Sequence, residues 1–147
     1  MAASIYDDAS RSALLRRLDG LRPDHAPRWG RMTAPQMVTH LLEAFRMPSG
    51  ELRIRRSFVP LRPLVRWLML YVVPFPKGAP TAPQLLRRVA ATWEADVSAL
   101  RGAIERATRP APGAPIGDHP IFGDMSVDDW GVLMHKHTDH HLRQFGL

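Results

Sequence analysis

Three short motifs that begin helices constrain the fold of this chain more than any other sequence feature. Thr33-Ala-Pro-Gln36 and Thr81-Ala-Pro-Gln84 are the same tetrapeptide. Each offers a threonine suited to an N-cap, a proline in the first turn, and a glutamine that can bond back to the cap. Ser126-Val-Asp-Asp129 is a third start, whose acids suit the positive end of a helix dipole. Each motif therefore predicts the first turn of a helix.

Four long helices follow from these starts and from the apolar spacing, over residues 4–19, 33–47, 81–108 and 126–145. The connection 48–80 is predicted to carry a short extra helix over 61–72. Prolines and glycines exclude regular structure from the connection 109–125. No window alternates as a strand does. The prediction is an all-α four-helix bundle with a long crossover between its second and third helices, formed by residues 1–147 as a single domain.

The composition excludes several kinds of site. The chain has no cysteine, so disulfides, zinc–thiolate sites, iron–sulfur clusters and cysteine nucleophiles are absent. Any metal must be held by His, Asp or Glu. The first residues show no secretory signal, and the longest apolar run, Trp67–Phe75, is far shorter than the roughly 20 residues of a membrane span. We expect a cytoplasmic protein without stable membrane insertion.

The formal net charge of +6 comes largely from an arginine-rich segment between Arg46 and Arg66. A basic chain invites a nucleic-acid interpretation. However, the aromatic residues do not interleave with the basic ones as a stacking platform for bases requires. We therefore predict no nucleic-acid partner, and interpret the segment as a solvated or interface-facing surface.

The histidines near the C-terminus are the most informative chemical feature. His137 and His141 lie one turn apart on the expected helix, on the stripe that should face the core. His135 projects to the opposite, solvated face, and His140 lies on the flank. Paired imidazoles on a helix can share a metal ion, and His40 on the second helix is the best candidate for a third ligand. Three histidines leave a coordination position open, as in catalytic sites, and imidazoles suit Zn, Ni, Cu or Fe.

The spacing alone leaves a second interpretation equally open, in which the buried histidines are only hydrogen-bonded to carboxylates or backbone groups. No HExxH motif indicates a general base. Glu43 is either a partner or base for the site or, as we prefer, a solvated helix acid. The tryptophans are expected in the core rather than in a substrate site: Trp29, Trp67, Trp93 and Trp130.

The last helix also carries a family resemblance. His137-Thr-Asp-His140-His141-Leu-Arg-Gln144 resembles the HxxHHRGQ signature of DinB-like (DinB/YfiT-type) proteins, with Leu142-Arg143 in place of the Arg-Gly. Met37-Val-Thr-His40-Leu41 resembles the MxxHL of their second helix. A subfamily with HPxFG and HHLRQFG motifs is more similar still. Its matching stretches are Trp29–Met32, Pro74–Thr81, His119–Gly123 and His140–Gly146.

The resemblance implies a four-helix bundle of left-handed connectivity, often a homodimer, with a divalent ion, Zn or Ni, on His40, His137 and His141. Such relatives include S-transferases that use low-molecular-weight thiols, a thiol-dependent maleylpyruvate isomerase, and proteins described as metal-dependent hydrolases. A thiol bound to such an ion is deprotonated near neutral pH, which makes a nucleophile without a protein cysteine. An anionic thiol or acidic small-molecule substrate is then expected at Arg53, Arg55 and Arg56. The loop 119–123 is expected to cover the opening of the site.

The competing hypothesis is a non-catalytic DinB-like bundle, a small-ligand-binding or stress-related dimer with structural histidines. The apolar stretch Trp67–Phe75 would then form the dimer or partner surface. A third hypothesis places that stretch on an anionic membrane surface. An enzyme requires its metal and loses activity when His137 becomes alanine, whereas a binding module keeps its fold and partner without metal.

Overall fold

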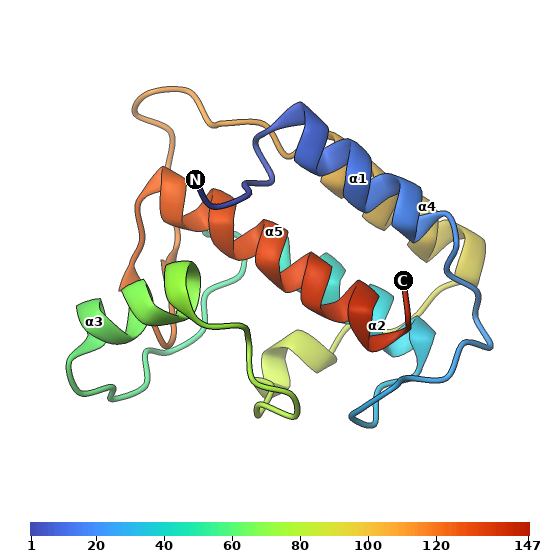
Figure 1. The fold of residues 1–147 in the computed structure, drawn as a ribbon. Helices are drawn as coiled ribbons and strands as arrows, with labels where there is room; N and C mark the ends of the chain where they lie inside the picture. The colour runs from blue at the N-terminus through green and yellow to red at the C-terminus, as the bar shows by residue number, and fades with distance from the viewer.

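The structure, a computed structural model of residues 1–147, is mostly helical. Its longer helices are α1 (Asp8–Leu18), α2 (Ala34–Ala44), α4 (Trp93–Glu105) and α5 (Val127–Gln144). Helix α1 packs against α4 and α5, and α2 packs against the same two helices. Figure 1 shows α1 and α4 side by side along one edge of the molecule, with α5 running across its middle. The predicted dominance of helices is confirmed.

Two of the predicted helix starts are confirmed in atomic detail. At α2, Thr33 Oγ1 accepts a hydrogen bond from the Gln36 backbone N–H, and the Gln36 side chain accepts one from the Thr33 backbone N–H. At α5, Ser126 and Asp129 form the same reciprocal pair. These capping boxes satisfy amide groups that a helix leaves without partners. The first predicted helix begins later than expected, at Asp8, because the preceding residues run beside α5, where the Ile5 N–H bonds to the Gly131 carbonyl.

The predicted helix over residues 81–108 is wrong. Its first part is only a 3-10 turn, η2 (Pro83–Leu86), and α4 begins at Trp93. Thr81 caps nothing, whereas Thr92 Oγ1 accepts a hydrogen bond from the Ala95 N–H. The Asp96 carboxylate also accepts one from the Ala91 N–H, at 2.9 Å. These bonds make residue 92 the start of a helix. They also occupy backbone N–H groups that a continuous helix over 81–108 would use for its own hydrogen bonds.

The crossover after α2 contains the predicted short helix, as α3 (Arg62–Trp67) and a π-helical turn, η1 (Leu68–Val72). Lys136 of α5 fixes its end, because its Nζ donates hydrogen bonds to the carbonyls of Met69, Leu70 and Val73. Figure 1 shows α3 beside the start of α5, away from α1 and α4. No helix of the structure combines the length and apolar character needed to cross a bilayer.

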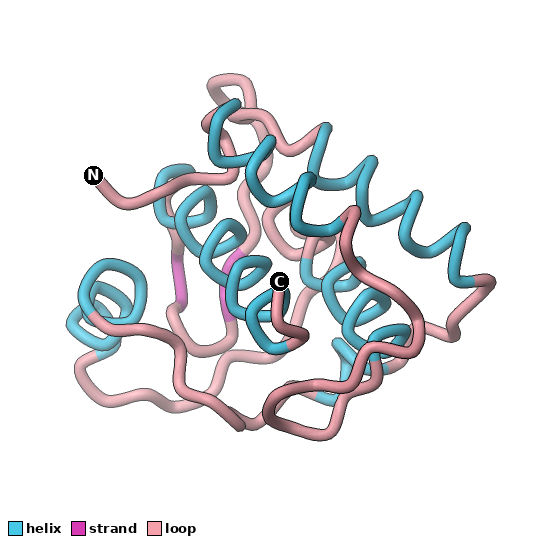
Figure 2. Tube along the Cα trace, turned by 45° about the vertical axis from the view of Figure 1, so that its right-hand side comes forward, coloured by secondary structure: helices cyan, strands magenta, loops and turns pink.

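Residues 109–125 were expected to lack regular structure, but they contain a minimal antiparallel sheet. Strand β1 (Asp118–His119) pairs with β2 (Gly123–Asp124), and Figure 2 shows both beside the helices. The Gly117 N–H bonds to the Pro48 carbonyl at 2.8 Å, and the Trp130 Nε1–H donates to the Gly117 carbonyl at 2.9 Å. A Cβ on Gly117 would overlap the Met47 carbonyl, so only glycine allows this approach. These contacts hold the hairpin between the end of α2 and the start of α5.

Candidate metal centre

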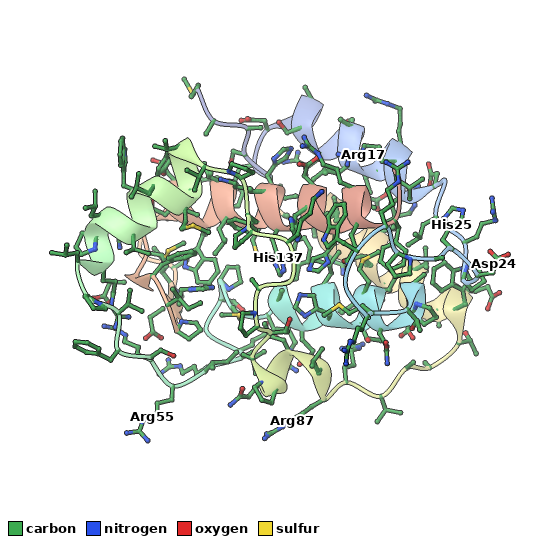
Figure 3. The ribbon with its side chains drawn as sticks, turned by 60° about the horizontal axis from the view of Figure 1, so that its bottom comes forward. Arg17, Asp24, His25, Arg55, Arg87 and His137 are labelled. Carbon is green, nitrogen blue, oxygen red and sulfur yellow. The ribbon has the colours of Figure 1, made fainter.

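The structure brings together the three histidines that the sequence singled out. His40 comes from the middle of α2, and His137 and His141 come from successive turns of α5. His137 Nε2 lies 3.0 Å from His40 Nε2 and 3.1 Å from His141 Nε2. The three ligand atoms lie within 4.8 Å of one another. In Figure 3, His137 lies near the centre of the view, between α5 and α2.

Burial keeps all three rings neutral. It lowers the pKa of His40 to about 4, against a smaller opposing effect of the Leu85 backbone. It lowers the pKa of His141 to about 3, and the neighbouring His40 adds to this effect. Burial followed by the charges of the other histidines holds the pKa of His137 well below its usual range. Each ring therefore presents one N–H and one lone pair near neutral pH.

One tautomer follows directly from the contacts. Gln144 Nε2 donates to the Trp29 carbonyl at 2.9 Å, and a carbonyl accepts only. The amide oxygen of Gln144 therefore faces His141 Nδ1, 2.8 Å away, and that nitrogen carries the proton. The lone pair of His141 is then on Nε2, the atom turned toward His137.

The convergence of the three Nε2 atoms favours a cation. His137 Nε2 carries at most one proton, so it can donate to one neighbour but not fully to both. The two nitrogens of the other contact then lie about 3 Å apart without a hydrogen bond between them. His40 Nδ1 is also buried without a hydrogen-bond partner, since the nearby Leu85 backbone lies outside ordinary hydrogen-bond geometry.

The donor set fits a divalent ion. Tetrahedral ligands at the usual Zn–N distance are about 3.3 Å apart, only a few tenths of an ångström more than the two separations here. Three neutral imidazoles suit Zn²⁺ or Ni²⁺ and leave at least one coordination position open. The residues present can therefore hold such an ion without rebuilding the fold.

A cavity of about 710 Å³ opens beside the three histidines. Its walls are mainly apolar and include Trp29, Phe75 and the hairpin residues 119–122. No aspartate, glutamate or serine lines it, and Arg31 is its only charged lining residue of the Lys/Arg type. A second cavity of about 490 Å³ borders the other side of Trp130 and Met134, which contribute to both. The histidine cavity can accept an apolar small molecule and offers it few charged groups.

The comparison with known families agrees with this geometry. The sequence profile of the DinB superfamily matches residues 6–145, nearly the whole chain. The chain belongs to the DinB superfamily. No curated protein and no solved structure gave a significant match. Membership in the DinB superfamily therefore rests on the full-length profile, and the three-histidine cluster lies within the matched residues.

The arginines expected to bind an anion do not line the histidine cavity of this DinB-superfamily chain. Arg53 and Arg55 are exposed, and Figure 3 shows Arg55 pointing outward at the edge of the molecule. Arg56 pairs with Asp118 at 2.6 Å and with Asp124, so it ties the basic segment to the hairpin. An anion-binding role of these three residues stays a prediction. Loop 119–123 lies at the cavity, as expected, because residues 119–122 line it.

Other expectations need correction. Glu43 is buried rather than solvated, and it pairs with Arg46 at 2.9 Å and Arg88 at 3.3 Å. These pairs come from the turn after α2 and from the segment that replaces the predicted helix. His135 is half-buried, and burial lowers its pKa. Of the tryptophans, Trp130 is fully buried, but Trp29 and Trp93 are only partly buried and Trp67 is exposed.

Sequence reasoning missed two residues of the site. Gln144 follows His141 by three residues, so the i,i+3 spacing on one helix face was a signal that could have found it. His119 was noted within its motif and in the loop expected to cover the site, but without a role of its own. Its position in the cavity depends on the small hairpin, which no strand-like pattern in the sequence predicts.

Proposed function

We propose that this protein holds a divalent metal ion, Zn²⁺ or Ni²⁺, on His40, His137 and His141 and is a metal-dependent enzyme of thiol transfer. The observation that carries the proposal is the convergence of three neutral Nε2 atoms beside an apolar cavity. The mutual packing of α1, α2, α4 and α5 supports the four-helix-bundle architecture that this family implies.

When bound, the ion would supply positive charge that favours the thiolate form of a low-molecular-weight thiol. The chain supplies the rest of the site. Gln144 orients His141, the apolar walls exclude water from the reacting groups, and Arg31 offers one positive charge to an anionic ligand. No side chain in the cavity is itself a thiol, a hydroxyl of serine or a carboxylate base. The proton acceptors that the cavity does offer are imidazoles such as His140, so hydrolysis stays a second option for this site.

The competing proposal is a non-catalytic, ligand-binding bundle with structural histidines. It is favoured by the two Nε2 contacts near 3 Å, of which one is a reasonable hydrogen bond between neutral rings. The exposed apolar side chains of the crossover, Trp67 and Val72 among them, would then cover a homodimer partner.

Metal content of untagged protein distinguishes the two proposals. We expect close to one divalent ion per chain by elemental mass spectrometry after incubation with Zn²⁺ or Ni²⁺ and gel filtration. His40→Ala and His137→Ala should lose it. His135→Ala is the matched control, because it removes a histidine from the same helix outside the cluster and should keep the ion. Absence of metal in the parent protein, or equal metal in all variants, would overturn the site. Only if metal binds are thiol-transfer substrates screened, with His137→Ala as the inactive reference.

A further inference from the structure

His119 borders the histidine cavity from the hairpin, outside the three-histidine cluster. Its Nδ1 lies 3.2 Å from the backbone nitrogen of Ile121 and 3.2 Å from that of Phe122. Both backbone groups are N–H donors, so Nδ1 must accept and carries no proton. The neutral ring therefore holds its proton on Nε2.

The ring is also held in place by aromatic neighbours. It stacks on Phe122, with centroids 4.6 Å apart and planes 17° apart, and meets the Trp130 ring edge-on at 5.9 Å. The backbone of His119 pairs with Gly123 across the hairpin. No protein group accepts a hydrogen bond from its Nε2. The structure thus fixes a donor at the cavity wall and leaves it without a partner in the protein.

Two further observations define what this donor can do. Burial lowers the pKa of His119 to about 4, although Asp118 opposes the effect. The ring is therefore a neutral donor at ordinary pH rather than an acid. His119 also lies near His137, because a charge on the His119 ring lowers the pKa of His137. The proton on Nε2 also makes His119 unsuited to be a fourth metal ligand through that atom, because a ligand nitrogen needs its lone pair.

We propose that His119 binds ligand: its Nε2–H donates a hydrogen bond to an oxygen of the small molecule in the cavity. The acceptor class is a carbonyl or carboxylate oxygen on an otherwise apolar molecule, since the rest of the wall is mainly apolar. The inference deepens the proposed function, because the ligand that His119 orients would be the one that faces the three histidines. It assigns a role to the His119–Gly123 motif that metal binding leaves unexplained.

The tautomer is tested first, on metal-free protein. A long-range ¹H–¹⁵N spectrum near neutral pH should show His119 as the Nε2–H tautomer. An Nδ1–H tautomer or a protonated ring would overturn the proposal whatever the state of the metal site.

Ligand binding is tested with benzoate, which joins an apolar ring to a carboxylate acceptor. In the parent protein, benzoate should shift the His119 Nε2–H resonance. His119→Asn should weaken benzoate binding about tenfold or more, as expected for a lost hydrogen bond to a charged acceptor. An asparagine oxygen can still accept from the N–H groups two and three residues on, so this variant keeps the turn and lacks the ring donor. His135→Asn is the control and should leave benzoate affinity unchanged.

The titration is run on metal-free and zinc-incubated protein, which separates the two proposals. A His119 response without any zinc binding would overturn the metal site and support the role of His119. Zinc on the three histidines with benzoate bound but no shift of the Nε2–H would overturn the role of His119 alone. Absence of benzoate binding to both forms also overturns it. The measurement on the parent protein decides the question even if His119→Asn fails to fold.

Discussion

The amide oxygen of Gln144 accepts the Nδ1–H of His141 at 2.8 Å and thereby turns the lone pair of that ring toward His137. The same amide donates to the Trp29 carbonyl, so it cannot rotate without breaking both bonds. Gln144 therefore links the last turn of α5 to the segment before α2. It sets the direction in which His141 can coordinate.

Replacing Gln144 by leucine should weaken Zn²⁺ binding about 10- to 100-fold, the usual cost of losing a partner that orients a metal-binding histidine. Competition with a chromophoric chelator measures the affinity. Arg143→Ala is the matched control, because Arg143 is the neighbouring residue on the exposed side of α5 and should leave zinc affinity unchanged. Equal affinity in Gln144→Leu and the parent protein would show that His141 is oriented by other contacts.

Acid should destabilise the domain. The pKa of His40 and that of His119 are about 4 in the folded protein, below the ordinary 6.5 of an unfolded chain. The unfolded chain therefore binds protons that the folded protein does not between these values. The free energy of unfolding should be constant above about pH 7 and fall as the pH drops toward 4, by up to roughly 3 kcal/mol for each histidine.

Urea unfolding of metal-free protein at about pH 7.5, 6 and 5 measures this dependence. His119→Asn removes one of the histidines with a lowered pKa and should show a shallower decline. An unfolding free energy that is the same at the highest and lowest pH would mean that these rings protonate in the folded state.

Trp130→Phe should lower the free energy of unfolding by about 1–3 kcal/mol, because it leaves the Gly117 carbonyl without its donor and a smaller ring in a fully buried position. Trp67→Phe is the matched control at an exposed tryptophan, and its effect should stay within about 0.5 kcal/mol. Urea unfolding near neutral pH compares the two. Similar losses in both variants would argue against the hydrogen bond to Gly117 as the tie between loop and helix.

Glu43→Gln should lower the free energy of unfolding by about 1–2 kcal/mol, less than for a fully buried pair, because the side chains of Arg46 and Arg88 are 44% and 37% exposed. Zinc affinity should not change, since Glu43 bonds to these arginines and to none of the three histidines. Glu94→Gln, at an exposed glutamate without an ion pair, changes the net charge in the same direction and is the control. A loss of zinc affinity in Glu43→Gln would instead make Glu43 a partner of the metal site.

The parts of this structure that were predictable are those coded by residues close in sequence. Thr33 with Gln36, and Ser126 with Asp129, cap their helices within one turn, so both starts could be read directly. The i,i+4 spacing placed His137 and His141 together for the same reason. His40 was chosen from its position on a second helix, and the packing of α2 against α5 confirmed the grouping.

The wrong predictions arose where two possible helix starts competed, or where the deciding contacts come from residues far apart in the sequence. Thr81 and Thr92 each offered a start, and Thr92 prevailed because Asp96 and Ala95 complete its turn. Glu43 looked solvated because its partner Arg88 lies 45 residues away, in a segment that was expected to be helical. The position of the proton on His119 depends on contacts within the hairpin. The two-residue strands of this hairpin are too short to give an alternating pattern in the sequence.

The border that Trp130 and Met134 form between the two cavities has a spectroscopic consequence. Trp130 contacts the space on both sides, Trp29 contacts only the histidine cavity, and neither Trp67 nor Trp93 lines either one. Two of the four indoles, Trp29 and Trp130, therefore distinguish the two cavities. Fluorescence from a variant that retains only Trp29 would report on the histidine cavity, and fluorescence from a variant that retains only Trp130 would report on both cavities. Comparing the emission wavelength and intensity of the two variants would therefore assign a bound molecule to one cavity.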